Sequence, residues 1–506
     1  MSADRHFDLL IIGGGINGAG IARDAAGRGL SVLLVEKNDL AGATSSASSK
    51  LIHGGLRYLE QYEFRLVAEA LSEREVLLKI APHIVHPLRF VMPHVPELRP
   101  RWMIRAGLYL YDHLSRRTRL PGSKGVQLRN SPFGAGLKPA LTYGFVYADC
   151  RVDDARLVIA NALSAREAGG EIATRTECVS AQRMPLGWAV QLRSGAGERT
   201  VTATALVNAA GPWVKEVLNE RLHQPSTDNV KLVKGSHIIV PKQYEGAHAL
   251  ILQNDDRRVV FMIPYEERFT LIGTTDVALG GNPPNPLVSD EEIAYLCRAA
   301  NRYLTRPVLP ADVVWTYAGV RPLYDDGTAN PSAITRDYTL RLDADGGTAP
   351  VLSVFGGKIT TYRKLAEHAL QKLRPWFPAM RAAWTACACL PGGNLGGTFE
   401  NFTDGVAARK YPWLPARVRC ALAHRHGERM YQIIAGAQSL RDLGTDFGGG
   451  LFACEVDYLI SEEWARDADD ILYRRSKAGL HMSAEQRGVL ASYVEARVAN
   501  GQTAVR

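Results

Sequence analysis

Glycines at the spacing G-x-G-x-x-G lie near the start of the chain and indicate dinucleotide chemistry. Gly13, Gly15 and Gly18 follow a short apolar run at 9–12 that is typical of a buried strand. The first glycine permits a tight turn, the second lets backbone approach a pyrophosphate, and the third allows a helix to pack closely on a strand. A helix is predicted over 19–28, and its N-terminus offers unpaired N–H groups and a positive dipole end to phosphates.

An acidic residue completes this motif. Glu36 ends a second apolar run at 31–35, about twenty residues after the glycines, where a carboxylate can accept hydrogen bonds from ribose hydroxyls. This order of elements favours an adenine dinucleotide site: a strand, the glycines, a helix, a second strand and an acid. The alternative is a glycine-rich turn that binds no ligand. The same site is expected to include Gly14, Asn17 and Lys37, which lie inside the motif or directly after its acid.

Two later segments repeat the succession of strand, small residues and turn. Ala210 and Gly211 end one strand-like run, and Gly356 and Gly357 end another before a predicted helix. Small residues let backbone pass close to a cofactor, although an ordinary exit from a strand gives the same pattern. A helix that begins under a flavin ring would favour the anionic reduced flavin through its positive end. Three separated segments that converge on one cofactor favour FAD over NAD.

These motifs require a discontinuous organisation of the 506 residues, of which 46% are hydrophobic. The predicted fold class is α/β, mixed with α+β: a Rossmann-like FAD-binding domain, a substrate domain with an antiparallel sheet, and a C-terminal α-helical domain. Runs such as SHIIVP and FTLIGTTD indicate the strands of the second domain. The predicted limits are 1–60, 150–230 and 335–385 for the first domain, 61–149 and 231–334 for the second, and 390–506 for the third.

The motifs resemble those of a known family. The stretches GGGINGAGIARDAAGRGLSV, ATSSASSKLIHGGLRYLE, NAAGPWVK, KGSHIIVP, WTYAGVRPL and SVFGGKITTYRKLAEHAL are similar to those of the bacterial respiratory (aerobic) glycerol-3-phosphate dehydrogenases. These are FAD enzymes with the flavoprotein fold of glycine oxidase and D-amino-acid oxidase. The resemblance spans nearly all of residues 8–370, and a weaker similarity continues to about residue 480.

The resemblance implies further contacts to FAD. Hydroxyl side chains after Glu36 would run along the pyrophosphate and ribityl chain, and the loop that begins at His53 would lie beside the isoalloxazine. A polar loop with helix caps is the alternative for the hydroxyl segment. The resemblance favours a non-covalent flavin, although His53 alone does not decide this. The additional cofactor residues expected are Thr44, Ser45, Ser48, His53, Gly54, Gly55, Lys358 and Thr360.

The substrate that the resemblance implies, sn-glycerol 3-phosphate, carries a phosphate dianion. Arginine pairs bidentately with phosphate and keeps its charge when it is partly desolvated. Arg57, Arg321 and Arg336 lie in or beside the family motifs, and Lys358 follows a glycine pair. Each of them abuts a segment expected to contact FAD, whereas any single one could equally be a surface cation. Tyr58 is expected to close the substrate pocket.

The implied reaction is oxidation of a secondary alcohol to dihydroxyacetone phosphate, with hydride transfer from C2 to flavin N5. A general base is useful, and a histidine has a suitable pKa. His237, at the start of a predicted strand, is the first candidate, with a structural histidine as the alternative. Arg321 and Lys358 could instead stabilise the developing alkoxide. Asp276 is a weaker candidate, because a carboxylate in a turn is its more ordinary role.

The resemblance implies that electrons pass to ubiquinone at a membrane surface. The formal net charge of +8 suits either anionic phospholipid or nucleic acid. A helix within 99–119 would carry Arg101, Arg105, Arg116 and Arg119 on one face and Met103, Gly107, Leu110, Tyr111 and Leu114 on the other, as in a helix that lies in a membrane interface. A helix that packs between domains is the alternative. The resemblance favours peripheral attachment to the cytoplasmic face of the inner membrane, and a homodimer is expected.

Other functions fit parts of the sequence. A glycerol-3-phosphate oxidase, or another FAD-dependent oxidase of this fold, would share the cofactor and pass electrons to oxygen. A nucleic-acid-binding module would rest on the basic charge alone, since no zinc-finger, helix-turn-helix or RNP-like spacing is present, and no nucleic acid partner is expected. The seven cysteines include no C-x-x-C pair and no His/Cys cluster, so no metal site is expected.

Overall fold

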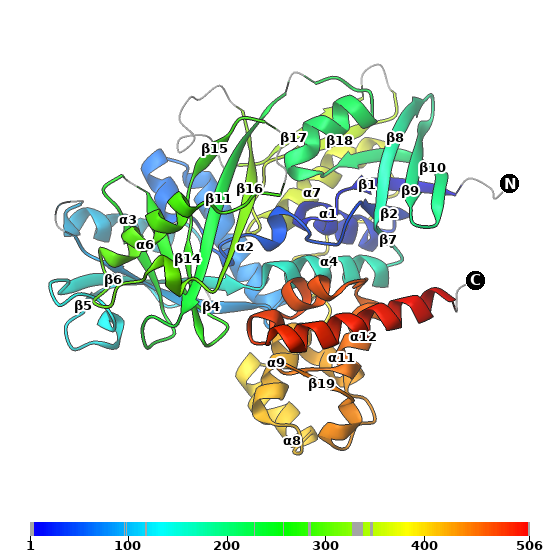
Figure 1. Ribbon diagram of the computed structural model, residues 1–506. Helices are drawn as coiled ribbons and strands as arrows, with labels where there is room; N and C mark the ends of the chain where they lie inside the picture. Colours follow the sequence, from blue (N-terminus) through cyan, green and yellow to red (C-terminus); the bar gives the residue numbers. More distant parts are fainter. Residues whose placement is uncertain are drawn as a thin grey trace.

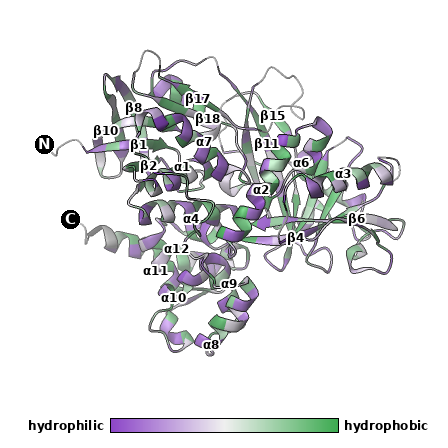
Figure 2. Ribbon diagram, turned by 180° about the vertical axis from the view of Figure 1, so that it is seen from behind, coloured by the Kyte–Doolittle hydropathy of each residue, from purple (hydrophilic) through white to green (hydrophobic). Residues whose placement is uncertain are grey.

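The computed structural model describes residues 5–95, 97, 99–116, 119–226, 228–256, 258–281, 285–325, 337–344 and 348–503. Two β-sheets lie side by side in it, and a group of helices from the end of the chain lies below them (Figure 1). The view from behind shows the same arrangement, with the termini near one sheet and helix α3 at the far end of the other (Figure 2).

The first sheet has a parallel centre. β1 (His6–Ile12) pairs in parallel with β2 (Val32–Glu36) and β10 (Gly197–Asn208), and these pair with β7 (Glu171–Thr174) and β18 (Val351–Phe355). β17 (Thr339–Asp343), β8 (Thr176–Met184) and β9 (Gly187–Ser194) add antiparallel strands. Apolar runs buried on both faces form the central strands, as expected for a parallel sheet that helices cover.

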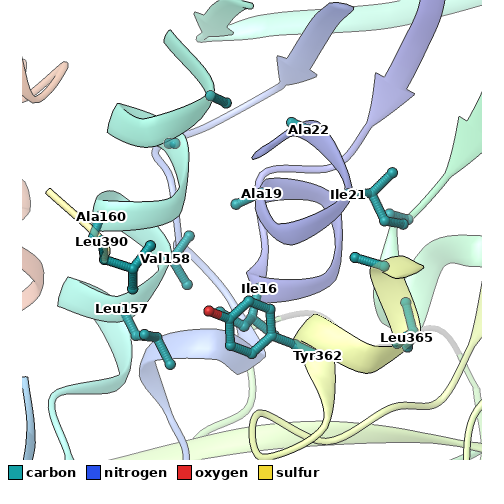
Figure 3. Close-up of a cluster of buried hydrophobic side chains, with 14 of the residues drawn as sticks. Ile16, Ala19, Ile21, Ala22, Leu157, Val158, Ala160, Tyr362, Leu365 and Leu390 are labelled. Carbon is teal, nitrogen blue, oxygen red and sulfur yellow. The ribbon is translucent and has the colours of Figure 1, made fainter. Parts of the chain in front are cut away.

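Helix α1 (Ile16–Gly27) packs between α4 (Asp154–Glu167) and α7 (Tyr362–Leu373) (Figure 3). Ala19 and Ala22 of α1 are fully buried, and small residues let the helices approach closely. A Cβ atom on Gly20 would lie 2.6 Å from the ring of Tyr362, so glycine is required where α7 crosses α1. The buried face of α1 fixes the position of its N-terminus at the end of β1.

Among the described strands, the second sheet is antiparallel except for one parallel pair, β4 with β12. Its strand order is β15-β11-β14-β13-β12-β4-β6-β3. Strand β16 pairs with β11, and β5 pairs with β6. Alternate residues of β11 face opposite sides, so Ile238 packs toward α6 (Asp290–Asn301) and Ile239 toward α2 (Phe64–Ile80) and α3 (Arg101–His113). The strands are β3 (Leu51–Ile52), β4 (Val85–Pro93), β5 (Lys124–Gln127), β6 (Tyr143–Val152), β11 (Val230–Pro241), β12 (Ala249–Gln253), β13 (Val259–Tyr265), β14 (Phe269–Gly273), β15 (Val277–Leu279) and β16 (Trp315–Tyr324).

The end of the chain forms a helical unit with its own buried core. Its helices are α8 (Ala408–Lys410), α9 (Ala416–His426), α10 (Met430–Ile433), α11 (Ala453–Glu462) and α12 (Ala484–Thr503), with a small hairpin of β19 (Asp446–Gly448) and β20 (Leu451–Phe452). Buried ion pairs join it to the first sheet's layer: Arg475 to Asp39 at 2.8 Å, and Lys477 to Asp153 at 2.9 Å.

The predicted fold class is confirmed: a first sheet with a parallel centre, a largely antiparallel second sheet and C-terminal helices. The domain limits stay a proposal. They group the strands of the first sheet, although β3 lies within 1–60 and pairs in the second sheet, and β6 crosses the proposed boundary at residue 150.

Candidate active site

The glycine-rich turn after β1 has the geometry that a dinucleotide requires. Gly13 has a φ of +112°, which favours glycine, and Gly15 is the N-cap of α1. A Cβ atom on Gly18 would lie 1.9 Å from the Gly13 carbonyl oxygen, so any side chain there would push the helix off the turn. The glycine at this position therefore lets the first turn of α1 lie close against the turn that precedes it, as the motif predicts.

Glu36, at the end of β2, lies directly behind this turn. Its carboxylate accepts hydrogen bonds from the N–H of Gly14 at 2.7 Å and from that of Asn38 at 2.8 Å. Burial raises the pKa of Glu36, and the two N–H donors oppose this effect. Lys37 places its Nζ 5.0 Å from the centre of the Trp213 ring, across the mouth of the pocket.

A pocket extends from this turn across the ends of β1, β2 and β10 to Pro322 of β16. It brings together segments from four parts of the chain that the sequence marked separately. The predicted cofactor residues that line it are Gly13, Gly15, Asn17, Glu36, Lys37, Thr44, Ser45, Ala210, Gly211, Gly356 and Gly357. Sequence reasoning did not mark Thr176, Trp213 or Arg221, which also line it, because nothing in their local pattern distinguishes them.

The hydroxyl segment after Glu36 is held in place at both ends. Ser45 Oγ accepts a hydrogen bond from the N–H of Ile16 at 3.0 Å, and Thr44 Oγ1 donates to the Val320 carbonyl at 2.7 Å. Ser48 differs from the prediction, because its hydroxyl donates to the buried carboxylate of Asp154 at 2.7 Å and does not line the pocket. This serine holds the loop.

Two loops meet beyond the pocket's far end. The N–H of His53 donates to Thr360 Oγ1 at 3.3 Å, and Lys358 Nζ lies 3.7 Å from the centre of the Tyr58 ring. Tyr58 packs on Gly55, whose φ of +79° and missing side chain leave room for the ring. The structure thus brings His53 and Thr360 together although they are about three hundred residues apart in the sequence. The Lys358 ammonium lies in the same region, where the flavin is predicted.

Asn17 links the α1 turn to the second loop. Its amide donates to the Gly356 carbonyl at 3.2 Å, and a Cβ atom on Gly357 would collide with this amide. The buried Oδ1 of Asn17 has no hydrogen-bond partner within the described chain. An acceptor left unpaired in a pocket wall is costly unless a ligand or water satisfies it. This residue therefore fits a polar ligand that crosses the start of α1.

A buried network supports the loop that contains Gly54. The N–H of Gly54 donates to Tyr111 Oη at 2.9 Å, Tyr111 Oη donates to Asp149 at 2.7 Å, and Arg74 pairs with Asp149 at 2.5 Å. Burial, with help from the cations Lys358 and Arg74, lowers the pKa of His53 to about 4, so this ring is neutral near pH 7. Sequence analysis missed this support, since its members come from α2, α3 and β6.

Arg321 lies on β16 and reaches across Gly235 of the neighbouring strand. Its Nη2 donates to the Thr275 carbonyl at 2.9 Å and pairs with Asp276 at 2.5 Å. A Cβ atom on Gly235 would lie 2.8 Å from that nitrogen, so the glycine makes room for the guanidinium. Asp276, weighed from sequence as a base, instead orients an arginine.

Arg57 is half-buried in the short helix Leu56–Gln61, one residue before Tyr58, and has no hydrogen bond or ion pair with the described parts of the chain. Such a guanidinium is available to an anionic ligand. Arg336, the other predicted substrate arginine, lies outside the described residues.

His237 is 3% exposed on β11, and its ring stacks on Tyr317 at a centroid distance of 4.7 Å. Its Nε2 shares a 2.8 Å hydrogen bond with Ser49 Oγ, and its Nδ1 has no partner within the described residues. Burial, then Lys50 and Arg321, lowers the pKa of His237 to about 3. The contact with Ser49, which is half-buried, could not be predicted from the sequence.

Two further observations concern metal ions and membranes. Among the described residues, no group of three or more His, Cys, Asp or Glu side chains is arranged to hold a metal ion. No helix within the described ranges is long and apolar enough to cross a bilayer.

Comparison with known proteins gives the family. Residues 8–363 match the model of the FAD dependent oxidoreductases. The chain is 56% identical to a glycerol-3-phosphate dehydrogenase of Pseudomonas aeruginosa, over 97% of this chain and 95% of the relative, and 52% identical to a D-erythritol 1-phosphate dehydrogenase of Brucella abortus, over 98% of each. A glycerol-3-phosphate dehydrogenase structure from Bacillus halodurans, complexed with FAD, superposes with a TM-score of 0.74 at 25% identity, covering 98% of this chain and 95% of that one.

These findings confirm the predicted family and its FAD cofactor, and the unpartnered Asn17 and the glycine turn fit a bound dinucleotide. The chain belongs to the FAD-dependent oxidoreductases, in the group of bacterial glycerol-3-phosphate dehydrogenases.

Proposed function

We propose that this protein oxidises sn-glycerol 3-phosphate to dihydroxyacetone phosphate with FAD and passes the electrons to a quinone. The observation that carries the proposal is the position of three predicted cations on segments around the site: Lys358 lies over Tyr58, Arg57 directly precedes Tyr58, and Arg321, held by Asp276, directly precedes Pro322 of the pocket wall. The relatives of known activity named above support a phosphorylated polyol as substrate.

The cations would bind the substrate phosphate. Arg57 has no competing partner in the described chain, and Arg321 is already oriented by Thr275 and Asp276, so little side-chain entropy is lost on binding. Lys358, held against the Tyr58 ring, supplies a third positive charge nearer the predicted flavin position. When several such groups bind the phosphate, the polyol chain attached to it is held in one orientation. The carbon that bears the reacting hydroxyl then has a fixed position relative to the cofactor.

His237 would take the proton of the reacting hydroxyl, through Ser49. The imidazole is neutral because its pKa is low, so Nε2 is free to accept a proton from Ser49 Oγ while that oxygen takes one from the substrate. A bound phosphate dianion counters the charges of Lys50 and Arg321 that help to lower this pKa, and so strengthens the base. FAD, when bound, supplies the acceptor for the hydride that leaves the substrate carbon.

The other proposed cofactor residues hold the site in shape. Thr360 and His53 join the two flavin-end loops, Asn17 and Gly357 join the second loop to α1, and Glu36 would accept from a ribose hydroxyl. Gly54 is fixed by Tyr111, and Ala210 and Gly211 form the turn across Gly13.

A second substrate, D-erythritol 1-phosphate, is favoured by the Brucella relative of nearly equal identity. Both substrates place a secondary alcohol near a phosphate ester, so the same residues serve either. Steady-state rates with a ubiquinone analogue separate them: our proposal predicts a higher kcat/KM for sn-glycerol 3-phosphate, and a higher value for D-erythritol 1-phosphate would overturn it. Turnover that proceeds with oxygen alone, with peroxide formed and no gain from quinone, would instead make the protein an oxidase.

The acceptor proposal includes attachment to the cytoplasmic face of the inner membrane through α3. The outward face of this helix exposes Trp102 at 70% and Tyr109 at 59%, with Met103 and Leu110 beside them. Exposed apolar side chains on one helical face suit a membrane interface. The helix differs from the predicted one: Tyr111, expected on this face, is buried, and Arg116 and Arg119 lie beyond its end at His113.

Co-sedimentation with vesicles of anionic phospholipid tests this attachment. Trp102→Gln should weaken binding, while Leu186→Gln, which removes a 92% exposed leucine from the distant β8–β9 turn, should not. Equal effects of the two substitutions would refute a specific role for α3.

A further inference from the structure

A second cavity, of about 480 Å³, lies between the C-terminal helical unit and the second sheet. One wall is a stripe of α9 at helical spacing, Arg417, Cys420, Ala421 and His424. The opposite walls are the end of β6 with Arg151 and the turn between β13 and β14 with Arg268. In Figures 1 and 2, α9 lies next to β4, and the His86 ring of β4 lies 4.7 Å from the His424 ring of α9.

The charges around this cavity are unbalanced. Lys50, Lys477 and Arg425 line it but are paired with Asp154, Asp153 and Glu455. Arg151, Arg268 and Arg417 line it as well, and none of their guanidinium groups has a hydrogen bond or ion pair with any described residue.

Acidic side chains do not cancel these arginines. Glu266 and Glu267 line the same cavity and act electrostatically on Arg151, and Glu266 also lies 3.6 Å from His481. Three solvent-exposed arginines on three walls against these two carboxylates still leave an excess of positive charge around the cavity. Such a field attracts a multiply charged anion.

Neutral polar groups accompany the arginines. His83 is 1% exposed in the cavity wall, and its Nδ1 has no hydrogen-bond partner in the described chain. His424 Nδ1 and His86 Nε2 lie 3.1 Å apart, so one of these two nitrogens donates a hydrogen bond to the other. Burial lowers the pKa of His83 to about 3 and that of His424 to about 4, so these rings are uncharged hydrogen-bonding groups. A buried histidine nitrogen without a hydrogen-bond partner costs folding free energy unless a ligand or a water molecule pairs with it.

We propose that this cavity binds a small soluble phosphate ester or polyphosphate, which joins the C-terminal unit to the catalytic part of the chain. Arg417 contacts the anion from α9, and Arg151 and Arg268 contact it from the second sheet. Planar guanidinium groups on separate walls suit the several oxygens of a phosphate. The bound anion reduces the motion of α9 relative to β6. Helix α9, which forms one wall of the cavity, lies apart from α3 in both views (Figures 1 and 2), and this favours a soluble ligand over a lipid headgroup.

Isothermal titration of the FAD-loaded holoenzyme with pyrophosphate, at constant ionic strength, tests the proposal. Arg417→Gln and Arg151→Gln should each weaken binding about tenfold, the usual effect of removing one charge-assisted contact. The matched control is Arg409→Gln, an exposed arginine of α8 that does not line the cavity, and it should bind like the parent. Arg57→Gln separates this cavity from the substrate site, because it should leave the cavity binding unchanged.

The same variants support a second readout. Pyrophosphate should slow hydrogen–deuterium exchange of α9 in the parent and in Arg409→Gln, and should have no such effect in Arg417→Gln. Parent-like FAD content and far-UV circular dichroism establish that the variants are folded. Unchanged affinity in both cavity variants, or absence of binding in the parent, would overturn the proposal. Tighter binding of a short-chain phosphatidylglycerol than of pyrophosphate would overturn the assignment to a soluble ligand.

Discussion

Gly235→Ala tests whether Arg321 binds the substrate phosphate. The new methyl group would lie 2.8 Å from Arg321 Nη2 and 2.6 Å from Thr274 Oγ1, closer than side-chain carbons approach such atoms. The guanidinium must therefore leave the Thr275 carbonyl, to which it now donates at 2.9 Å. A lost hydrogen bond to a charged group costs about 1.5–3 kcal/mol, which corresponds to a fall in kcat/KM of about 10- to 100-fold.

The fall should arise mainly from a higher KM for sn-glycerol 3-phosphate, because a phosphate contact stabilises ground state and transition state alike. The control is Gly280→Ala, since a Cβ atom there meets no atom within 4 Å. Steady-state kinetics with a ubiquinone analogue, with FAD content measured for each variant, provide the comparison. A Gly235→Ala enzyme with normal FAD content and a parent-like KM would refute the role of Arg321.

Three other predictions concern the cofactor, stability and pH. Gly18→Ala should lose bound FAD, because its methyl group would lie 1.9 Å from the Gly13 carbonyl oxygen; retention of FAD at parent stoichiometry would contradict this account of the turn. Asp154→Asn should destabilise the fold by about 3–5 kcal/mol, since it leaves the buried Lys50 ammonium without the carboxylate now 2.9 Å away, and a chemical-denaturation midpoint equal to the parent's would contradict this. Lowering the pH from 7 to 5 should destabilise the protein through His83, whose pKa of about 3 in the folded state lies below the unfolded value of 6.5. The unfolded chain then binds the proton and the folded chain does not, so stability is present above pH 6.5 and is lost as the pH falls toward 3. His83→Gln should reduce the slope of the free energy of unfolding against pH, measured by urea denaturation, by up to about 1.4 kcal/mol per pH unit, and an unchanged slope would show that His83 does not contribute.

Local motifs explain why much of the site could be predicted from sequence. The contacts among Gly13, Gly18 and Glu36 form within about thirty residues, and the spacing itself fixes their geometry. Lys358 and Tyr58 could each be predicted from their neighbours in the sequence, but their contact joins segments three hundred residues apart and has no local signal.

Long-range partners explain what the sequence could not predict. The Tyr111–Asp149–Arg74 network depends on which face of α3 turns inward. The pattern of 99–119 instead predicted that the face with Tyr111 contacts the membrane. Ser48 and Ser49 are adjacent and chemically alike. The backbone of their loop directs Ser49 toward His237 and Ser48 toward Asp154. A sequence pattern contains no signal for that choice.

Anaerobic mixing of the FAD-loaded protein with sn-glycerol 3-phosphate, followed by a ubiquinone analogue, tests the central claim most directly. The account predicts that the visible absorbance band of the oxidised flavin is lost on mixing and returns when the quinone is added. A band that persists in the presence of saturating sn-glycerol 3-phosphate would contradict the proposed substrate, whatever the state of the FAD pocket.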